Sequence, residues 1–322
     1  EFKKKITYIK IYNLIESKKK KDGSLCKKST LSVFENWNYK KVFWQHKVDK
    51  FIKNFDLVIS DSVPQVYDLT KLYNIPSINI SHYTWDWLYK KLYGNRKKHI
   101  LDNLSLSYKK CDFFLFPPFT NDEILRKYKK KTREINFILS DSFYKKKRKK
   151  RKSLNCLIMD NGSNVMSKKI ENIIPFLDKI TNVFFYVSCN TISKNSIKLL
   201  SRKKNCKAIF GLKKVHEYMN NCDFLIARGG FNTISESINL KIPSLLSYEK
   251  NNPEVINNID SLYFKNYCSI INSNDFNKNF IKRIEKFLIC EFKTLKKNIN
   301  TYKPSSSGPK DIVNFIKRML SN

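Results

Sequence analysis

Residues 223–258 constrain the fold of this chain more than any other stretch. A short apolar run at 224–227 leads through Arg228 into Gly229-Gly230, and a helical pattern follows at once. The helix pattern ends at Lys241-Ile242-Pro243, where a second apolar run begins. A strand that turns sharply into a helix and then into another strand is the repeating unit of parallel α/β sheets. The segment therefore predicts an α/β domain.

The glycine pair and the helix start are suited to a phosphate-bearing ligand. Glycine lets a backbone approach a ligand closely, and a helix N-terminus offers amide groups and a positive dipole end to an anion. The hydroxyls of Thr233 and Ser235 can add phosphate contacts, and Glu236 can accept hydrogen bonds from ribose hydroxyls. An ordinary tight turn is the alternative, because short glycine motifs often bind nothing.

The same segment resembles the donor-binding region of GT-B glycosyltransferases, most closely family 28, which includes the N-acetylglucosaminyltransferase of peptidoglycan synthesis. The matching residues are Arg228, Gly230, Thr233, Glu236, Pro243 and Asn257. The chain departs from the family at Lys241, where glycine is frequent, at Pro253-Glu254 in place of Glu-Gln, and at Asn258 in place of alanine. The resemblance implies a donor site formed by Gly162, Ser163, Arg228, Gly229, Gly230, Phe231, Asn232, Thr233, Glu236, Glu254 and Asn257. An ordinary turn is the alternative for Gly162 and Ser163.

Strand and helix patterns alternate through both halves of the 322-residue chain, which is long enough for two domains. We expect two Rossmann-like doubly wound α/β domains facing a cleft, as in the GT-B architecture: 1–143 on the acceptor side and 154–322 on the nucleotide-sugar side. Residues 144–153 are the predicted linker, because 145–152 are all basic and such charges repel rather than pack. A nuclear-targeting segment is the alternative. In families of this kind the last helix often crosses back to the first domain.

The first half carries a second resemblance, on the residues that follow a predicted strand at 77–81. Here the chain resembles the glycosyltransferase-like N-terminal domain of L-arabinokinases, and the matching residues are Thr84-Trp85-Asp86 and Tyr89. In this chain His82 and Tyr83 stand where that domain has Asn and Phe. His82 is a candidate general base, with a structural role as the alternative. Asp61 is a second candidate on the acceptor side, with a helix N-cap as the alternative. The Trp85 ring suits either sugar stacking or a core.

The Gly-x-Gly-His loop that usually opens the first domain in these families has no counterpart here. We therefore expect the first domain to be incomplete at its N-terminus, where residues 3–11 alternate like a strand. The favoured function is metal-independent and cofactor-independent transfer of a hexosyl group from a UDP-sugar to an acceptor hydroxyl that the sequence does not identify. The alternatives are a nucleotide-sugar hydrolase or epimerase, and a non-catalytic binding module.

Composition limits the cellular location and the binding partners that we expect. The chain has no apolar stretch near the ~18 residues that span a bilayer and no signal-peptide pattern. Its eight cysteines form no Cys-x-x-Cys pair, which argues against zinc and fits the cytoplasm. The net charge of +35 comes from 63 basic and 28 acidic residues spread along the chain. One explanation of this charge is a drift of the composition toward Lys, Asn and Ile. Among anionic partners, peripheral contact with the inner face of a membrane is favoured over nucleic acid.

Overall fold

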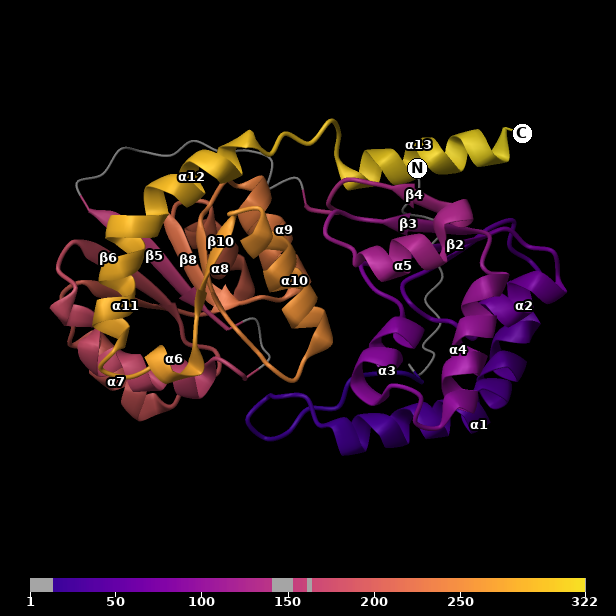
Figure 1. Cartoon of the computed structure of the whole chain (residues 1–322), viewed down its shortest axis with the longest axis horizontal. Helices are drawn as coiled ribbons and strands as arrows, with labels where there is room; N and C mark the ends of the chain where they lie inside the picture. Colours follow the sequence, from indigo (N-terminus) through magenta and orange to yellow (C-terminus); the bar gives the residue numbers. More distant parts are fainter. Residues whose placement is uncertain (1–13, 141–152, 161–163, 322) are drawn as a thin grey trace. The chain divides into compact units, whose positions relative to one another are not determined.

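The computed structural model describes residues 14–140, 153–160 and 164–321 (Figure 1). These residues form two compact units. Within the described ranges, the first unit comprises residues 14–19, 25–116 and 123–133, and the second comprises residues 20–24, 117–122 and those from 134 onward. The basic segment that we predicted as a linker lies outside the described residues except for Ser153, and so does the strand predicted at 3–11.

The first unit contains a four-stranded sheet in the order β1-β2-β3-β4. Strands β1 and β2 pair in parallel with Val58 opposite Ser77, and β2 and β3 pair in parallel with Ile78 opposite Phe113. The strands are β1 (Val58–Ser60), β2 (Ser77–Ile80), β3 (Phe113–Phe116) and β4 (Thr132–Glu134). The helices are α1 (Lys27–Ile52), α2 (Val66–Leu72), α3 (Trp85–Tyr93), α4 (Lys98–Lys110) and α5 (Asp122–Lys127).

Aromatic side chains form the core of the first unit. Trp37, Tyr67, Tyr89 and Tyr108 are fully buried. Trp85 belongs to the same core and donates a hydrogen bond from Nε1 to the Ser62 carbonyl at 2.8 Å. The aromatic density around residue 85 is therefore explained by packing, which settles the alternative of a sugar-stacking ring in favour of a core residue.

A break separates the two helices that follow β2. α3 ends at Tyr93, and α4 begins at Lys98. Gly94 and Lys97 between them have positive φ angles of 59° and 48°. A left-handed residue cannot continue a right-handed helix, and Gly94 is well suited to end one.

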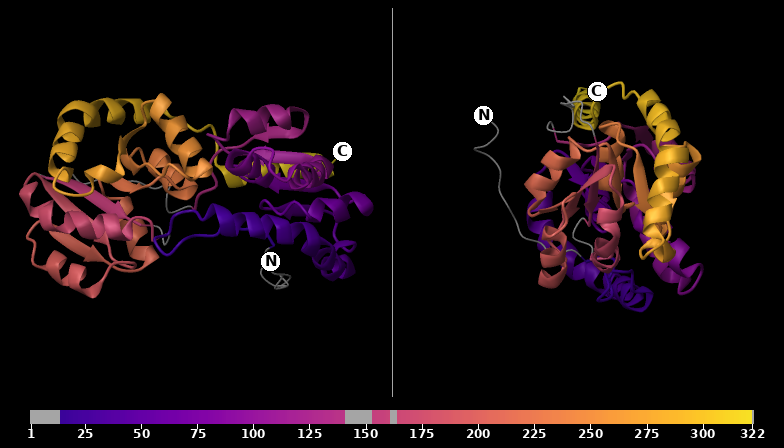
Figure 2. Two further views of the ribbon diagram at one scale, coloured as in Figure 1. Left: turned by 60° about the horizontal axis from the view of Figure 1, so that its bottom comes forward. Right: turned by 90° about the vertical axis from the view of Figure 1, so that its left-hand side faces the viewer.

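The second unit is built on a six-stranded parallel sheet in the order β10-β9-β8-β5-β6-β7 (Figures 1 and 2). This is the doubly wound order, in which the direction of winding reverses between β5 and β8. The strands are β5 (Leu154–Met159), β6 (Val183–Ser188), β7 (Cys206–Ile209), β8 (Phe224–Arg228), β9 (Ser244–Ser247) and β10 (Cys268–Ile271).

Helices cover both faces of this sheet. One face packs against α6 (Ser167–Ile173), α7 (Lys194–Ser201) and α11 (Phe280–Lys286). The other packs against α8 (Leu212–Met219), α9 (Phe231–Asn239) and α10 (Pro253–Phe264). Because both faces are covered, β5 and β8 are almost continuously apolar, which is the pattern that made them recognisable.

The C-terminal elements are α12 (Phe292–Thr301) and α13 (Gly308–Leu320). The first residue of α13, Gly308, donates a backbone hydrogen bond to the Phe137 carbonyl at 3.0 Å, and a Cβ atom there would lie 2.6 Å from that oxygen. Asp311 accepts a bond from the Asn136 amide at 2.8 Å. These contacts tie the start of α13 to the strand-like segment of its own unit. Across the described ranges no helix has the length and apolarity that a membrane span needs.

Candidate functional site

The candidate site lies where β8 passes into α9, at the carboxyl edge of the second unit's sheet. This is the place where the winding of the sheet reverses, and open α/β sheets bind ligands at such a point. Gly230 is the N-cap of α9, with φ −71° and ψ 146°. The first hydrogen bond within the helix joins the Ile234 amide to the Gly230 carbonyl at 3.1 Å. The amides of the first turn therefore have no partner supplied by the helix itself.

The two glycines of the turn serve different purposes. A Cβ atom on Gly229 would overlap the side chain of Ile259 in α10, with Cδ1 at 2.8 Å, and the Gly229 carbonyl accepts a bond from the buried Asn258 amide at 3.2 Å. On Gly230 the nearest atom to a Cβ would be Arg228 Nη1, at 4.0 Å. Gly229 is thus required by packing against α10. Gly230 has open space where a side chain would lie, while its own amide donates to the Arg228 carbonyl at 2.9 Å.

Arg228 ends β8 in a buried ion pair. Its Nε donates to Oε2 of Glu249 at 2.8 Å, and the two side chains are 18% and 9% exposed. The other oxygen of Glu249, Oε1, is buried and has no hydrogen-bond partner among the described residues. A buried carboxylate oxygen without a partner is costly, so it marks a position that a hydroxyl or amine donor would satisfy.

Lys169 extends this polar cluster toward β5. It donates from Nζ to the Ser247 hydroxyl at the end of β9, at 2.7 Å. Burial lowers the pKa of Lys169, and the nearby carboxylates of Glu249 and Asp160 oppose that shift. Sequence reasoning did not identify Lys169 or Glu249. The only local signal was that Glu249 follows a predicted strand, at the edge where ligands collect.

A hollow of about 1210 Å³ adjoins the cluster. Lys169 and Glu249 line it, together with residues that are mostly polar, among them Asn164, Asn190, Thr191, Asn251 and Asn272. The glycine turn does not line it. The turn remains the better candidate for a diphosphate, because it combines open space at Gly230 with the N-terminus of α9.

Glu236 lies in the second turn of α9 with its side chain 12% exposed, and its Oε1 is 4.0 Å from Nε2 of His216 in α8. Burial raises the pKa of Glu236 to about 7. A carboxyl group with a strongly perturbed pKa beside a ligand-binding turn is a candidate functional residue.

The remaining predicted donor residues on α9 differ in accessibility. Asn232 is exposed at the helix start, while Phe231 is half-buried with its ring 6.0 Å from that of Phe137. Thr233 is fully buried, and the Ser235 hydroxyl donates to the Phe231 carbonyl at 2.7 Å. In this conformation the two hydroxyls are directed into the protein and do not face a ligand.

The other predicted donor residues lie on α10 and on the loop after β5. Glu254 is half-buried in the first turn of α10. Asn257 donates to the Phe119 carbonyl at 3.1 Å and accepts from Asn121 at 2.7 Å, so its amide joins α10 to the segment at 117–122. Gly162 and Ser163 lie outside the described residues.

In the first unit, the two candidate bases have different surroundings. Asp61 is exposed after β1, and α2 begins only at Val66 with Gln65 at its N-cap, so the N-cap interpretation of Asp61 is wrong. His82 is half-buried, with its ring edge-on to Tyr83 at 4.9 Å.

Asp86, from the arabinokinase-like motif, is buried and pairs with Lys127 and with the Tyr128 hydroxyl, the latter at 2.7 Å. Burial acts to raise the pKa of Asp86, but the Lys127 ammonium and the hydrogen bonds outweigh it and hold the pKa below its usual value. This motif residue ties α3 to the α5 region and has a structural role.

No protein-family model and no curated protein sequence matches the chain. Solved structures do match. The calicheamicin glycosyltransferase CalG4 aligns at 12% identity with a TM-score of 0.66, covering 92% of this chain and 81% of that one. MurG of Acinetobacter baumannii aligns at 11% identity and a TM-score of 0.57, covering 88% and 80%. Phytolacca americana UGT2, complexed with UDP-2fluoro-glucose and pterostilbene, aligns at 9% identity and a TM-score of 0.62, covering 89% and 77%.

These neighbours share the GT-B fold, and the α/β, GT-B prediction is confirmed for this chain. The assignment to family 28 and the incomplete first domain stay predictions.

Proposed function

We propose that this protein is a glycosyltransferase that binds a nucleotide-sugar, with a UDP-sugar as the expected donor, at the β8–α9 turn. The observation that carries the proposal is the open space beside Gly230, which caps the N-terminus of a helix at the winding reversal of the sheet. Such a position is suited to a diphosphate. The neighbouring proteins of the same fold are glycosyltransferases, and one of them was solved with a UDP-sugar analogue.

In this proposal Glu236 binds the ribose. Its largely buried carboxyl group lies in the second turn of α9, beyond the Gly230 N-cap, and a carboxylate accepts two ribose hydroxyl hydrogens well. The Glu249 oxygen that has no partner offers a second acceptor nearby on the same edge, because Glu249 is held by Arg228 of β8.

The reaction then needs no bound metal. The acceptor oxygen forms a bond to C1 of the sugar while the bond from C1 to the diphosphate oxygen breaks, and the hydroxyl proton passes to a base. Amides at the start of α9 stabilise the negative charge that develops on the leaving diphosphate. His82 and Asp61 are the proposed candidates for the base.

Titration calorimetry with UDP tests the donor site. The Glu236→Ala substitution removes charge-assisted hydrogen bonds worth about 1.5–3 kcal/mol, so we expect UDP to bind at least ~10-fold more weakly. Glu217→Ala is the matched control, because Glu217 is an exposed glutamate on α8 of the same unit. UDP should also raise the melting temperature of the wild type. No heat of binding and no thermal shift at millimolar UDP would refute the donor site.

A turnover assay distinguishes a transferase from a hydrolase and from a non-catalytic binding module. A transferase releases UDP from a UDP-sugar only when an acceptor is supplied, whereas a hydrolase releases free sugar without one. A binding module would bind UDP with the same dependence on Glu236 and release nothing. Screening UDP-, GDP- and ADP-sugars in the same assay identifies the nucleotide.

A further inference from the structure

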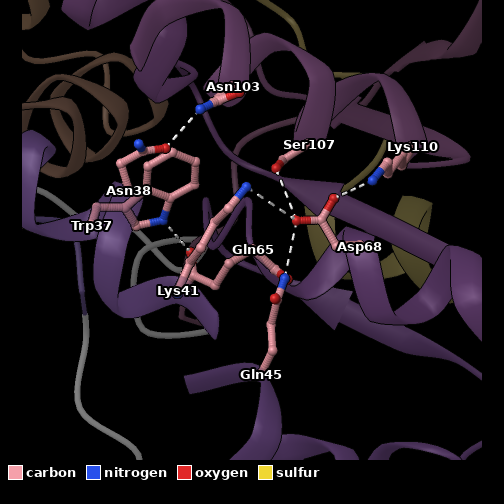
Figure 3. Close-up of polar contacts among 9 residues, drawn as sticks. All are labelled: Trp37, Asn38, Lys41, Gln45, Gln65, Asp68, Asn103, Ser107 and Lys110. Atoms are coloured by element: carbon pink, nitrogen blue, oxygen red, sulfur yellow. Dashed lines mark hydrogen bonds and ion pairs between the residues drawn. The ribbon is translucent and has the colours of Figure 1, made fainter. Parts of the chain in front are cut away.

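Helix α1 has one face that is bound firmly to the first unit. Leu31, Phe34 and Trp37 on this face are buried. Trp37 donates from Nε1 to the Gln65 side chain at 3.0 Å, and Gln45 donates to the Gln65 carbonyl at 3.0 Å (Figure 3). These bonds connect α1 to the start of α2.

Asp68 of α2 anchors the same face a second time. Its carboxylate accepts from Gln45 at 3.0 Å, from Ser107 at 3.2 Å and from Lys110 at 2.6 Å, and Lys41 lies 3.8 Å away (Figure 3). Gln45 and Lys41 belong to α1, while Ser107 and Lys110 belong to α4. Contacts from α1 and α4 meet at one carboxylate of α2, so the rotation of α1 about its axis is fixed.

The opposite face of α1 consequently carries its apolar side chains outward. Tyr39 is 73% exposed, Val42 is 48% exposed and Phe43 is 71% exposed. Spacings of three and four residues place these side chains next to one another on a helix. Single exposed apolar residues are ordinary, but a contiguous group is a mark of an interaction surface.

Positive charge borders this group. Lys40, Lys47 and Lys50 are exposed on the same side of the helix. The two acidic residues of α1 are engaged elsewhere, since Glu35 pairs with Lys97 and Asp49 accepts from the Tyr73 hydroxyl. We call Tyr39, Lys40, Val42, Phe43, Lys47 and Lys50 the α1 outer face.

We propose that the α1 outer face docks on an anionic lipid bilayer. Aromatic rings and Val42 can enter the boundary between headgroups and acyl chains, while lysine side chains extend to the lipid phosphates. A helix of 26 residues is about 39 Å long and can lie flat on such a surface. Nucleic acid is disfavoured, because the exposed side chains of Val42 and Phe43 would gain no apolar burial against a phosphate backbone. The surface lies in the first unit and does not depend on the proposed donor site.

Sedimentation with lipid vesicles tests the apolar part. We expect the wild type to bind vesicles of phosphatidylcholine with 30% phosphatidylserine and to bind pure phosphatidylcholine weakly. The double substitution Tyr39→Ser and Phe43→Ser should lower the partition coefficient at least ~10-fold, because each ring loses apolar burial in the bilayer. The control is Phe264→Ser with Ile289→Ser, whose side chains are 83% and 80% exposed in the second unit. Unchanged binding of the α1 variant, or an equal loss in the control, would overturn the proposal.

A second pair of variants tests the charge. Replacing Lys40, Lys47 and Lys50 with Gln should weaken binding ~100-fold, at about 5-fold per lysine near an anionic surface. The control replaces Lys194, Lys198 and Lys204, which are exposed in the second unit. The overall charge of +35 is reduced by three in both cases. Equal losses would show nonspecific attraction by the whole chain and would overturn a site on α1.

The remaining outcomes are also decisive. If the wild type dimerises without lipid and the Tyr39/Phe43 variant is monomeric in sedimentation velocity, the face is an interface between copies and the lipid proposal is wrong.

All four tryptophans lie in the first unit, at positions 37, 44, 85 and 87. Tryptophan fluorescence therefore confirms directly that each α1 variant has kept the fold of the unit that carries the substitution.

Discussion

Ionisation of Glu236 is expected to destabilise the second unit. Burial raises the pKa of this carboxyl group to about 7, whereas a glutamate in an unfolded chain has a pKa of about 4.3. The difference is roughly 2.7 pKa units, and each unit corresponds to about 1.4 kcal/mol, so the effect is on the order of 3–4 kcal/mol. The side chain is only 12% exposed, so solvent screens the effect little.

The sign follows from the direction of the shift. A raised pKa in the folded state means that the protonated carboxyl group favours folding, and this contribution is fully present below pH ~4.3. It is lost as the pH rises through about 7, because the buried group must then carry a charge. Glu236→Gln cannot ionise. The variant should match the wild type at pH 4 and exceed its stability by about 3–4 kcal/mol at pH 8.5.

Hydrogen exchange measured by mass spectrometry on peptides from β8 and α9 is the suitable assay, because it reports opening of this unit alone. Tryptophan fluorescence reports the first unit and serves as an internal reference that should not change between variants. His216→Gln is the second control: because burial is the cause of the shift, removing the imidazole should preserve the pH profile. Equal protection of Glu236→Gln and wild type at pH 8.5, or a difference already present at pH 4, would refute the reasoning.

Three further substitutions have definite expected outcomes. Gly229→Ala should destabilise the second unit by about 1–3 kcal/mol, because the new methyl overlaps Ile259, and thermal melting checks this. Gly230→Ala should destabilise the second unit by only about 0.5–1 kcal/mol, because alanine is a poorer N-cap than glycine. It should weaken UDP binding in calorimetry, since its methyl enters the open space; unchanged affinity would contradict a diphosphate there. Asp86→Asn should cost the first unit about 3 kcal/mol through the lost pair with Lys127, measured by urea unfolding with tryptophan fluorescence.

The framework of the second unit was predictable from sequence because its strands are buried on both faces. The apolar run at 224–227 is β8 (Phe224–Arg228), with one residue added at its end. Helix α6 gives way after Ile173 to a 3₁₀ turn at Ile174–Lys179, in which Pro175 lies. Proline removes a backbone donor and disfavours a continuing α-helix.

Helix α1 was not predicted. Its outer face carries Tyr39, Val42 and Phe43, so apolar residues occur on all sides and the amphipathic period is obscured. The N-terminus has no side-chain cap and no acidic residue in its first turn, so the usual start signals are missing as well. The features that hid this helix are those that the proposed membrane surface requires.

The polar cluster of the candidate site was also beyond sequence reasoning. Arg228 and Glu249 are 21 residues apart, and Lys169 reaches Ser247 across 78 residues. Such pairs form because the order of the strands in the sheet brings distant residues together, and a local sequence pattern does not predict that order.

Lys241 is a different case. It occupies a position where the resembling family often has glycine, and its φ is +57°, so the backbone has kept the left-handed conformation that favours glycine.

The contact between Gly229 and Ile259 has a consequence for how this chain can diverge. The side chain at 259 occupies the space that any larger residue at 229 would need. A substitution at 229 is therefore tolerated only after 259 has become smaller, and the reverse order passes through a destabilised intermediate. The residues that evolution can place at position 229 of the turn thus depend on a residue of α10. Among descendants, residues 229 and 259 should covary, with a small residue at one permitting a larger residue at the other.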